Sequence, residues 1–183
     1  MGRDKAGVAL QGVPFATRLA SLLSTLVEDV LLVGGDPPVE APGRRVSDPR
    51  GPACALRGLV GALGAATTPR VLVLATDLPL VTPDLLLALV AFPEADAVVP
   101  CPREGPQPLC ALYRRAPVWA AARARLDAGD LALRGVLDDI GVHRLEPDDL
   151  AVLDREGRAL WNVNTPEDLE RARAWLGPAE GRA

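Results

Sequence analysis

The chain alternates short, continuous apolar runs with segments whose apolar residues recur at helical spacing. The apolar runs predict strands at 30–33, 71–75, 97–99, 109–113, 142–145 and 160–163. The periodic segments predict helices at 15–26, 56–63, 82–90, 119–129, 130–141 and 165–176, and the polar stretch 34–51 is expected to be a loop. Strands that are apolar on both faces and alternate with helices are typical of a sheet covered on both sides. We therefore expect a single-domain α/β fold with a mostly parallel sheet and helices on both faces.

Length and composition limit the classes of protein to which the chain can belong. Its 183 residues favour one domain, and 49% of them are apolar, which is enough for a sizeable core. The net charge of −4 gives no general attraction to nucleic acid or to an anionic membrane, and no apolar run approaches the ~20 residues of a membrane span. Three cysteines without a C-x-x-C pair indicate reduced thiols. These features predict a cytoplasmic protein.

An aspartate follows the strand expected at 71–75. In open α/β sheets, ligands bind outside the carboxyl ends of the strands, so Asp77 in the segment Thr-Asp-Leu-Pro (76–79) is expected beside a ligand. Mg²⁺ prefers one or two carboxylates together with substrate phosphates and water, and Asp77 is therefore a candidate metal ligand. The alternative is that Asp77 only accepts hydrogen bonds in the turn before Pro79.

Two other segments carry groups suited to a nucleotide. Lys5 offers a compact positive charge for a phosphate, and Gly2 allows the backbone to approach a ligand closely. Asp48 lies in a loop (47–52) that leads into a predicted helix, where it could accept hydrogen bonds from a hydroxyl or a base. The alternatives are a solvated chain end for the first segment and an acid that favours the helix dipole for Asp48.

Three amide side chains are candidates for binding a polar heterocycle. Gln107 precedes a predicted strand, and Asn162 and Asn164 are the chain's two asparagines. Two residues apart on an extended strand, these asparagines would present their amides on one face. Neutral amides can bind a pterin-like or nucleobase-like edge, although turn formation is the alternative explanation. The residues that follow, 165–168, are fully explained as a helix start.

The reaction class follows from the groups that the sequence lacks. It contains no G-x-S-x-G motif and no constellation around a nucleophilic serine or cysteine, and His143 is expected to be a surface strand residue. We therefore expect in-line displacement on phosphorus, in which the protein positions the groups and neutralises charge.

Taken in order, these segments resemble the molybdenum cofactor guanylyltransferases, a nucleotidyltransferase family with a Rossmann-like sheet. The first five residues match the end of the family's glycine-rich start, and 76–79 is similar to its metal-binding Asp-x-Pro turn. Residues 107–113 resemble its Gln-Pro-Leu-x-Ala-Leu-Tyr segment, and 162–169 match its C-terminal signature.

This resemblance implies transfer of GMP from GTP to the molybdopterin cofactor, giving the guanine dinucleotide form and pyrophosphate. It implies that Lys5 and Asp77 are the catalytic residues, and that Asp77 holds Mg²⁺. Gly2 and Asp48 would join them in binding the nucleotide. The molybdopterin side would comprise Gln107, Asn162 and Asn164. The attacking phosphate of the pterin is already an anion, so no general base is required. Further proteins of molybdenum cofactor biosynthesis are candidate partners.

The resemblance also has gaps, and these leave alternatives open. The family's first strand and the Leu-Ala-Gly-Gly part of its loop have no counterpart here, and Met1 coincides with a methionine inside that loop. We expect the true start to lie upstream. We expect a nucleotidyltransferase domain at 1–177 that is shortened at its N-terminus, followed by a frayed tail at 178–183. We also expect less than full activity. The alternatives are a molybdopterin cytidylyltransferase or a related nucleotidyltransferase, or an inactive chain that binds the cofactor or a partner.

Overall fold

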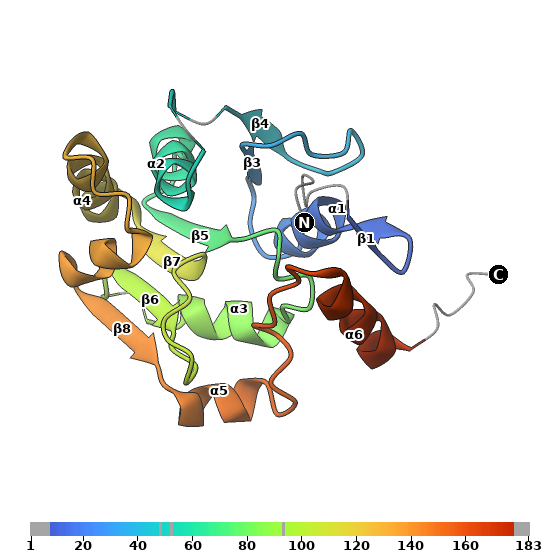
Figure 1. Cartoon of the computed structure of the whole chain (residues 1–183). Coiled ribbons are helices and arrows are strands. Elements are labelled where there is room, and N and C mark those ends of the chain that lie inside the picture. Colours follow the sequence, from blue (N-terminus) through green and yellow to red (C-terminus); the bar gives the residue numbers. More distant parts are fainter. Residues whose placement is uncertain (1–7, 48, 52, 93, 178–183) are drawn as a thin grey trace.

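The computed structural model of the chain describes residues 8–47, 49–51, 53–92 and 94–177. The strands are β1 (Ala9–Leu10), β2 (Val13–Pro14), β3 (Leu31–Val33), β4 (Arg44–Val46), β5 (Arg70–Leu74), β6 (Ala97–Pro100), β7 (Cys110–Arg114) and β8 (Val142–Leu145). The helices are α1 (Phe15–Ser24), α2 (Ala55–Ala65), α3 (Pro83–Val90), α4 (Arg115–Asp127), the 3₁₀ helix η2 (Leu133–Asp138), α5 (Pro147–Leu153) and α6 (Pro166–Leu176). Figure 1 shows their arrangement.

The central sheet has the strand order β5-β7-β6-β8. β5, β6 and β8 run in one direction, and β7 is antiparallel to both of its neighbours. The expectation of a mostly parallel sheet is therefore only partly confirmed. The connection from β6 to β7, residues 101–109, is too short for the helical crossover that parallel strands require, so the chain turns back. A second, parallel pair joins β3 and β4, and the short β1–β2 hairpin is antiparallel.

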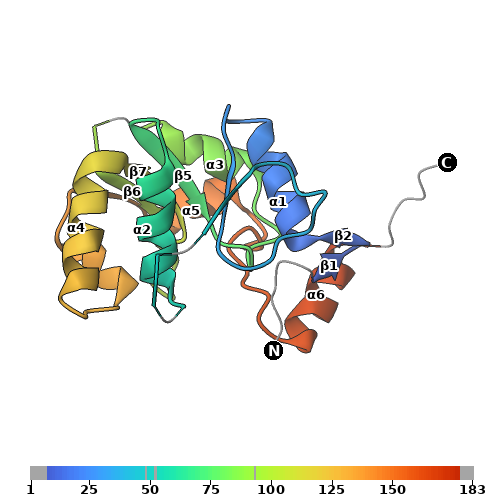
Figure 2. The same cartoon turned by 90° about the horizontal axis from the view of Figure 1, so that it is seen from above.

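Helices cover both faces of the central sheet, as the sequence predicts (Figures 1 and 2). On one face, α1, α3 and α5 enclose a core that includes Leu19, Leu86 and Leu150. On the other face, α2, α4 and η2 enclose a core that includes Leu59 and Val118. Within the described ranges, no helix combines the length and the apolar character that a membrane span requires.

Three local predictions were wrong, and the β1–β2 hairpin and helix α5 were not predicted. The expected loop 34–51 contains β4, whose two arginines gave no apolar signal. The segment 160–163 forms no strand. Gly135 N–H donates to the carbonyl of Ala132, an i→i+3 bond, and η2 is a 3₁₀ helix where an α-helix was expected. Helix α5 was not predicted, because its capping box is built from Glu146 and Asp149 instead of a serine or threonine.

The start of α6 is held by a reciprocal pair of caps. The Thr165 hydroxyl accepts a hydrogen bond from the Asp168 N–H at 3.1 Å. The Asp168 carboxylate accepts from the N–H groups of Thr165 at 2.9 Å and of Asn164 at 3.0 Å. These bonds satisfy donors that the helix itself leaves unpaired, and they confirm the helix start predicted at Thr165. They also fix the backbone that carries Asn164.

A buried hydroxyl anchors the loop before β7. Tyr113, which is 1% exposed, donates its hydroxyl proton to the carbonyl of Pro108 at 2.6 Å. Burial raises the pKa of Tyr113, so the side chain remains a neutral donor at ordinary pH. This bond holds the residue that follows Gln107.

The cap of α6 leads to a prediction about pH. Hydrogen bonds from the backbone of Asn164, and then of Thr165, lower the pKa of Asp168 below its ordinary value of 3.8. A carboxyl with a lowered pKa stabilises the fold above its unfolded value, and this stabilisation is lost as pH falls through the folded value. We expect Asp168→Asn to lower the unfolding temperature at pH 7, and the difference from the parent to shrink as pH falls below 3.8. Thermal unfolding followed from pH 7 to pH 2 measures this difference. Glu167→Gln in the same turn is the control, and a difference for Asp168→Asn that stays constant to pH 2 would contradict the assignment.

The anchor of the loop before β7 leads to a second prediction. Tyr113→Phe keeps the ring but leaves the buried carbonyl of Pro108 without its donor. We expect the free energy of unfolding to fall by about 1–3 kcal/mol, the cost of an unsatisfied buried group. Urea unfolding measures this change, and an unaltered midpoint would show that water replaces the hydroxyl.

Candidate functional site

One edge of the central sheet gathers the segments that the sequence singles out. The carboxyl ends of β5, β6 and β8 lie at this edge, and so does the start of β7, because β7 runs in the opposite direction. The turn after β5 carries Asp77, and the loop before β7 carries Gln107. Antiparallel pairing thus brings a residue that precedes a strand beside one that follows a strand.

Asp77 is half-buried in the turn that ends β5. Its backbone carbonyl accepts a hydrogen bond from Val163 N–H at 2.8 Å. From α1, the Arg18 guanidinium donates to the carbonyl of Pro79 at 3.1 Å. The turn is therefore held from two sides by segments far from it in the sequence, and the position of Asp77 at the edge is fixed.

Gln107 is held by its own backbone. Its N–H donates to the carbonyl of Pro100 at 2.9 Å, and its carbonyl accepts from Cys110 N–H at 2.9 Å. Nearby, Ala75 N–H donates to the carbonyl of Leu109 at 2.7 Å. This last bond links the loop that carries Gln107 to the turn that carries Asp77.

Asn162 and Asn164 flank a buried residue. Val163 is 1% exposed and packs with Leu10 and Phe15 in a small core beneath α6. Asn162 is half-buried and Asn164 is exposed. The bond between Val163 and Asp77 places both asparagines next to the carboxylate-bearing turn.

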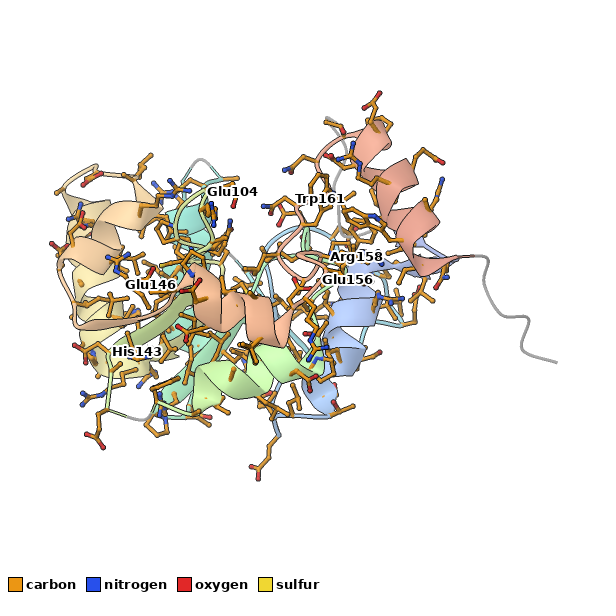
Figure 3. The ribbon with its side chains drawn as sticks, turned by 90° about the horizontal axis from the view of Figure 1, so that it is seen from below. Glu104, His143, Glu146, Glu156, Arg158 and Trp161 are labelled. Carbon is orange, nitrogen blue, oxygen red and sulfur yellow. The ribbon has the colours of Figure 1, made fainter. Side chains whose placement is uncertain are left out.

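Two tryptophans and two arginines adjoin the asparagines, and the sequence analysis did not single them out. Trp161 and Trp175 meet edge to face at 5.2 Å. Arg171 lies 5.0 Å from the ring centre of Trp161, and Arg158 lies 5.2 Å from that of Trp175. Figure 3 shows Trp161 and Arg158 on the segment that leads from α5 to α6. No local spacing in the sequence signals this cluster, because the two arginine–tryptophan pairs are 10 and 17 residues apart in the chain.

A polar cavity of about 380 Å³ lies at the carboxyl ends of β3 and β4. Gly34 and Gly35 both have positive φ, 68° and 59°, a conformation that favours glycine. The Arg45 guanidinium donates to the carbonyl of Pro37 at 2.7 Å, and this bond stabilises the other wall of the cavity. The cavity is lined by Leu32, Gly34, Gly35, Pro37, Arg45, Val46 and Ser47. The sequence analysis treated this stretch as a loop and did not predict the cavity.

Four of the predicted site residues therefore share one edge of the sheet: Asp77, Gln107, Asn162 and Asn164. Gly2, Lys5 and Asp48 lie outside the described residues, and so does the tail 178–183. His143 lies in β8 as expected, where its ring stacks on Phe92 with centres 3.7 Å apart.

The donor groups at this edge suit only one kind of metal site. Among the residues that the structure describes, no group of three or more histidine, cysteine, aspartate or glutamate side chains could hold an ion by itself. Of the predicted site residues that the structure describes, Asp77 is the one that carries a carboxylate. Such a site fits an ion that takes most of its ligands from substrate phosphates and water, as Mg²⁺ does.

The buried thiol of Cys110 near this edge is poorly suited to act as a nucleophile. Cys101 and Cys110 are buried and unoxidised. Burial raises the pKa of Cys110 to about 12, so its thiol stays protonated at neutral pH. A buried, protonated thiol of this kind does not favour covalent catalysis by Cys110.

Comparison with known proteins agrees with this arrangement. The model of the family described as the MobA-like NTP transferase domain matches residues 1–150. A protein of Chloroflexus aggregans named "Probable molybdenum cofactor guanylyltransferase" is 37% identical, over 96% of this chain and 88% of its own length. A protein of Natronomonas pharaonis with the same name is 33% identical, over 94% of this chain and 90% of its own length.

Solved structures share the fold at lower identity. Molybdopterin-guanine dinucleotide biosynthesis protein A of Archaeoglobus fulgidus superposes with a TM-score of 0.73 at 22% identity, over 96% of this chain and 91% of its own. The 2-C-methyl-D-erythritol 4-phosphate cytidylyltransferase of Thermus thermophilus also gives 0.73, at 21% identity, over 94% of this chain and 93% of its own. The fold is thus that of the nucleotidyltransferases, and the family match over 1–150 together with the relatives above 30% identity shows that this chain belongs to the MobA-like NTP transferase family.

Proposed function

We propose that this chain transfers GMP from GTP to the molybdopterin cofactor, forming the guanine dinucleotide cofactor and releasing pyrophosphate. The names of the relatives at 37% and 33% identity support this reaction. The observation that carries the proposal is the pair of backbone bonds, Val163 to Asp77 and Ala75 to Leu109, that brings a carboxylate and three amides to one sheet edge.

The nucleotide side is assigned to four residues. Asp77 would hold Mg²⁺ against the phosphates of GTP, and Lys5 would neutralise their remaining charge. Gly2 and Asp48 would bind the rest of the nucleotide. The polar cavity beside Gly34 and Gly35 supports this placement, since it lies at the carboxyl end of the strand that precedes Asp48 in the chain. Bound Mg²⁺ would supply charge neutralisation on the phosphates.

The molybdopterin side is assigned to Gln107, Asn162 and Asn164. Their neutral amides offer both donors and acceptors to a pterin edge. The terminal phosphate of the cofactor would attack the α-phosphorus of GTP. A phosphorus–oxygen bond forms to that phosphate, and the bond to the β-phosphate breaks, so that pyrophosphate leaves with the electron pair. The attacking oxygen is already anionic, and the protonated thiol of Cys110 takes no part.

The setting of this activity is also a proposal. We assign residues 1–177 to one nucleotidyltransferase domain, and we place the protein in the cytoplasm, where its free cysteines would stay reduced. GTP and molybdopterin are its proposed small-molecule partners, with other proteins of molybdenum cofactor biosynthesis as protein partners. The net charge of −4 gives the protein no general attraction to nucleic acid, and we propose no nucleic-acid partner.

The carboxylate of Asp77 leads to a prediction. Asp77→Asn keeps the size of the side chain but removes the charge that would hold Mg²⁺. We expect pyrophosphate release to fall by about 100-fold or more, the scale seen when one group that stabilises a transition state is removed. Stabilisation by Mg-GTP, measured against the unfolding temperature of each variant without ligand, should also be lost. Asp84→Asn, at an exposed acid of α3, is the matched control. If Mg-GTP stabilises Asp77→Asn as much as the parent, Asp77 is not the metal ligand.

The choice of base is tested by thermal unfolding with Mg-GTP and with Mg-CTP. A ligand at 100 times its dissociation constant should add about 2.7 kcal/mol of stability. We expect a rise in unfolding temperature with Mg-GTP only. A rise with Mg-CTP alone would favour a cytidylyltransferase. Binding of molybdopterin without a response to either nucleotide, and without turnover, would favour a chain that only binds the cofactor.

A further inference from the structure

The molybdopterin side of the candidate site, as assigned above, carries no positive charge. Gln107, Asn162 and Asn164 are neutral amides. Molybdopterin, in contrast, has a terminal phosphate and a dithiolene, and both groups are anionic. Proteins hold anionic groups most strongly through charge-assisted hydrogen bonds, for which arginine is well suited. A cation close to these amides would therefore complete this side of the site.

A tight turn lies in the loop that carries Gln107. Gly105 N–H donates to the carbonyl of Pro102 at 2.9 Å and closes the turn, and Gly105 has a positive φ of 113°. Just before the turn, Cys101 N–H donates to the carbonyl of Leu145 at 2.9 Å. The turn therefore lies beside the end of β8 and closes two residues before Gln107.

The guanidinium of Arg134, from η2, lies against this turn. A Cβ added at Gly105 would lie 3.4 Å from Nη1, 3.5 Å from Nη2 and 3.6 Å from Cζ of Arg134. Three nearly equal distances place the plane of the guanidinium over Gly105. The N–H groups lie in that plane, so they point along the surface of the turn and not into it.

Arg144 approaches the same turn from β8. Its Nη1 lies 3.6 Å from Sγ of Cys101, a weak acceptor. Along β8, Val142 packs in the core beneath η2, and Leu145 packs in the core on the opposite face. Because side chains alternate along a strand, Arg144 lies on the face that η2 covers. Arg134 and Arg144, which we call the arginine pair, thus reach one turn from one face of the sheet.

The arginine pair has no acidic partner among the residues that the structure describes. No ion pair joins either guanidinium to a carboxylate there, although Glu104 lies in the turn itself (Figure 3) and Asp138 lies in η2. Asp130 and Asp139, which flank η2, both pair with Arg125. Both members of the pair are exposed. Their charges therefore remain available to an anion from outside the chain.

We propose that the arginine pair binds an anionic group of the molybdopterin cofactor beside the amide of Gln107. This inference rests on the proposed function, in which molybdopterin is the acceptor. The turn follows β6, whereas Asp77 follows β5 on the far side of β7. The bound group therefore lies on the acceptor side of the site and not on the nucleotide side. The group is the terminal phosphate or the dithiolene, and the experiment distinguishes the two.

The first test is the affinity for molybdopterin, measured by equilibrium dialysis under argon. We expect Arg134→Gln and Arg144→Gln each to raise the dissociation constant by about tenfold or more, the scale of one hydrogen bond to a charged group. Arg44→Gln is the matched control, because Arg44 is also exposed and donates to a backbone carbonyl, that of Ala65 at 3.2 Å, outside this loop. Equal affinities of the parent and the double variant would overturn the proposal.

Two modified cofactors identify the group that is bound. One lacks the terminal phosphate, and the other carries a dithiolene made neutral by alkylation with iodoacetamide. If the phosphate is the bound group, substituting the arginine pair should have no effect on the affinity for the first cofactor. If the dithiolene is the bound group, the substitutions should have no effect on the affinity for the second. An undiminished effect with both cofactors would overturn the proposal.

Further measurements separate binding from a structural role. We expect the unfolding temperature and the stabilisation by Mg-GTP to match those of the parent in each variant, and Arg134→Lys to recover part of the affinity because it keeps the charge. Should a variant fail to fold, the parent alone provides a test. Its affinity for molybdopterin should fall as NaCl rises from about 0.05 M to about 0.5 M, because salt screens exposed charges. An affinity that does not depend on salt would overturn the proposal.

The proposed function and the arginine pair can fail separately. A parent that binds molybdopterin through the pair but releases no pyrophosphate from Mg-GTP would overturn the proposed function and support the pair. Pyrophosphate release by the double variant with an unchanged KM for molybdopterin would overturn the pair and support the function.

Discussion

Two backbone hydrogen bonds hold the candidate site together, and the rest of the arrangement depends on them. Ala75 N–H to Leu109 ties the turn after β5 to the loop before β7, and Val163 N–H to Asp77 ties the same turn to the segment before α6. Main-chain bonds of this kind do not depend on which side chains line the edge. The edge can therefore present Asp77, Gln107 and the two asparagines to a substrate while the backbone beneath them stays fixed.

The reversed strand β7 makes this possible. In an entirely parallel sheet, only residues that follow strands would reach the carboxyl edge. Because β7 runs the other way, the residues that precede it also lie there, and Tyr113 further down the same strand anchors that loop through Pro108. The sheet core and the site are thus stabilised by the same strand, so that packing around Tyr113 and the position of Gln107 are linked.

The sheet is interrupted between β3 and β5. β5 pairs with β7 on one side, β3 pairs with β4 on the other, and the facing edges of β3 and β5 line an apolar cavity. All residues of both strands are only half-buried, whereas those of β6 are fully buried.

The sequence by itself determined the features that depend on residues close to one another in the chain. Apolar periodicity set most helices, Thr82 and Thr165 set two of their starts, and the continuous run after residue 70 set β5. The position of Asp77 at the carboxyl edge of the sheet also followed, because it depends only on the end of a strand in an α/β sheet. Only the tertiary structure decided the direction of β7, the pairing of the arginine-rich β4, the contact between Asp77 and Val163, and the apolar cavity between β3 and β5. The physical reason is that strand direction, long-range backbone bonds and the space between elements depend on partners far away in the chain, which no local pattern of residues specifies.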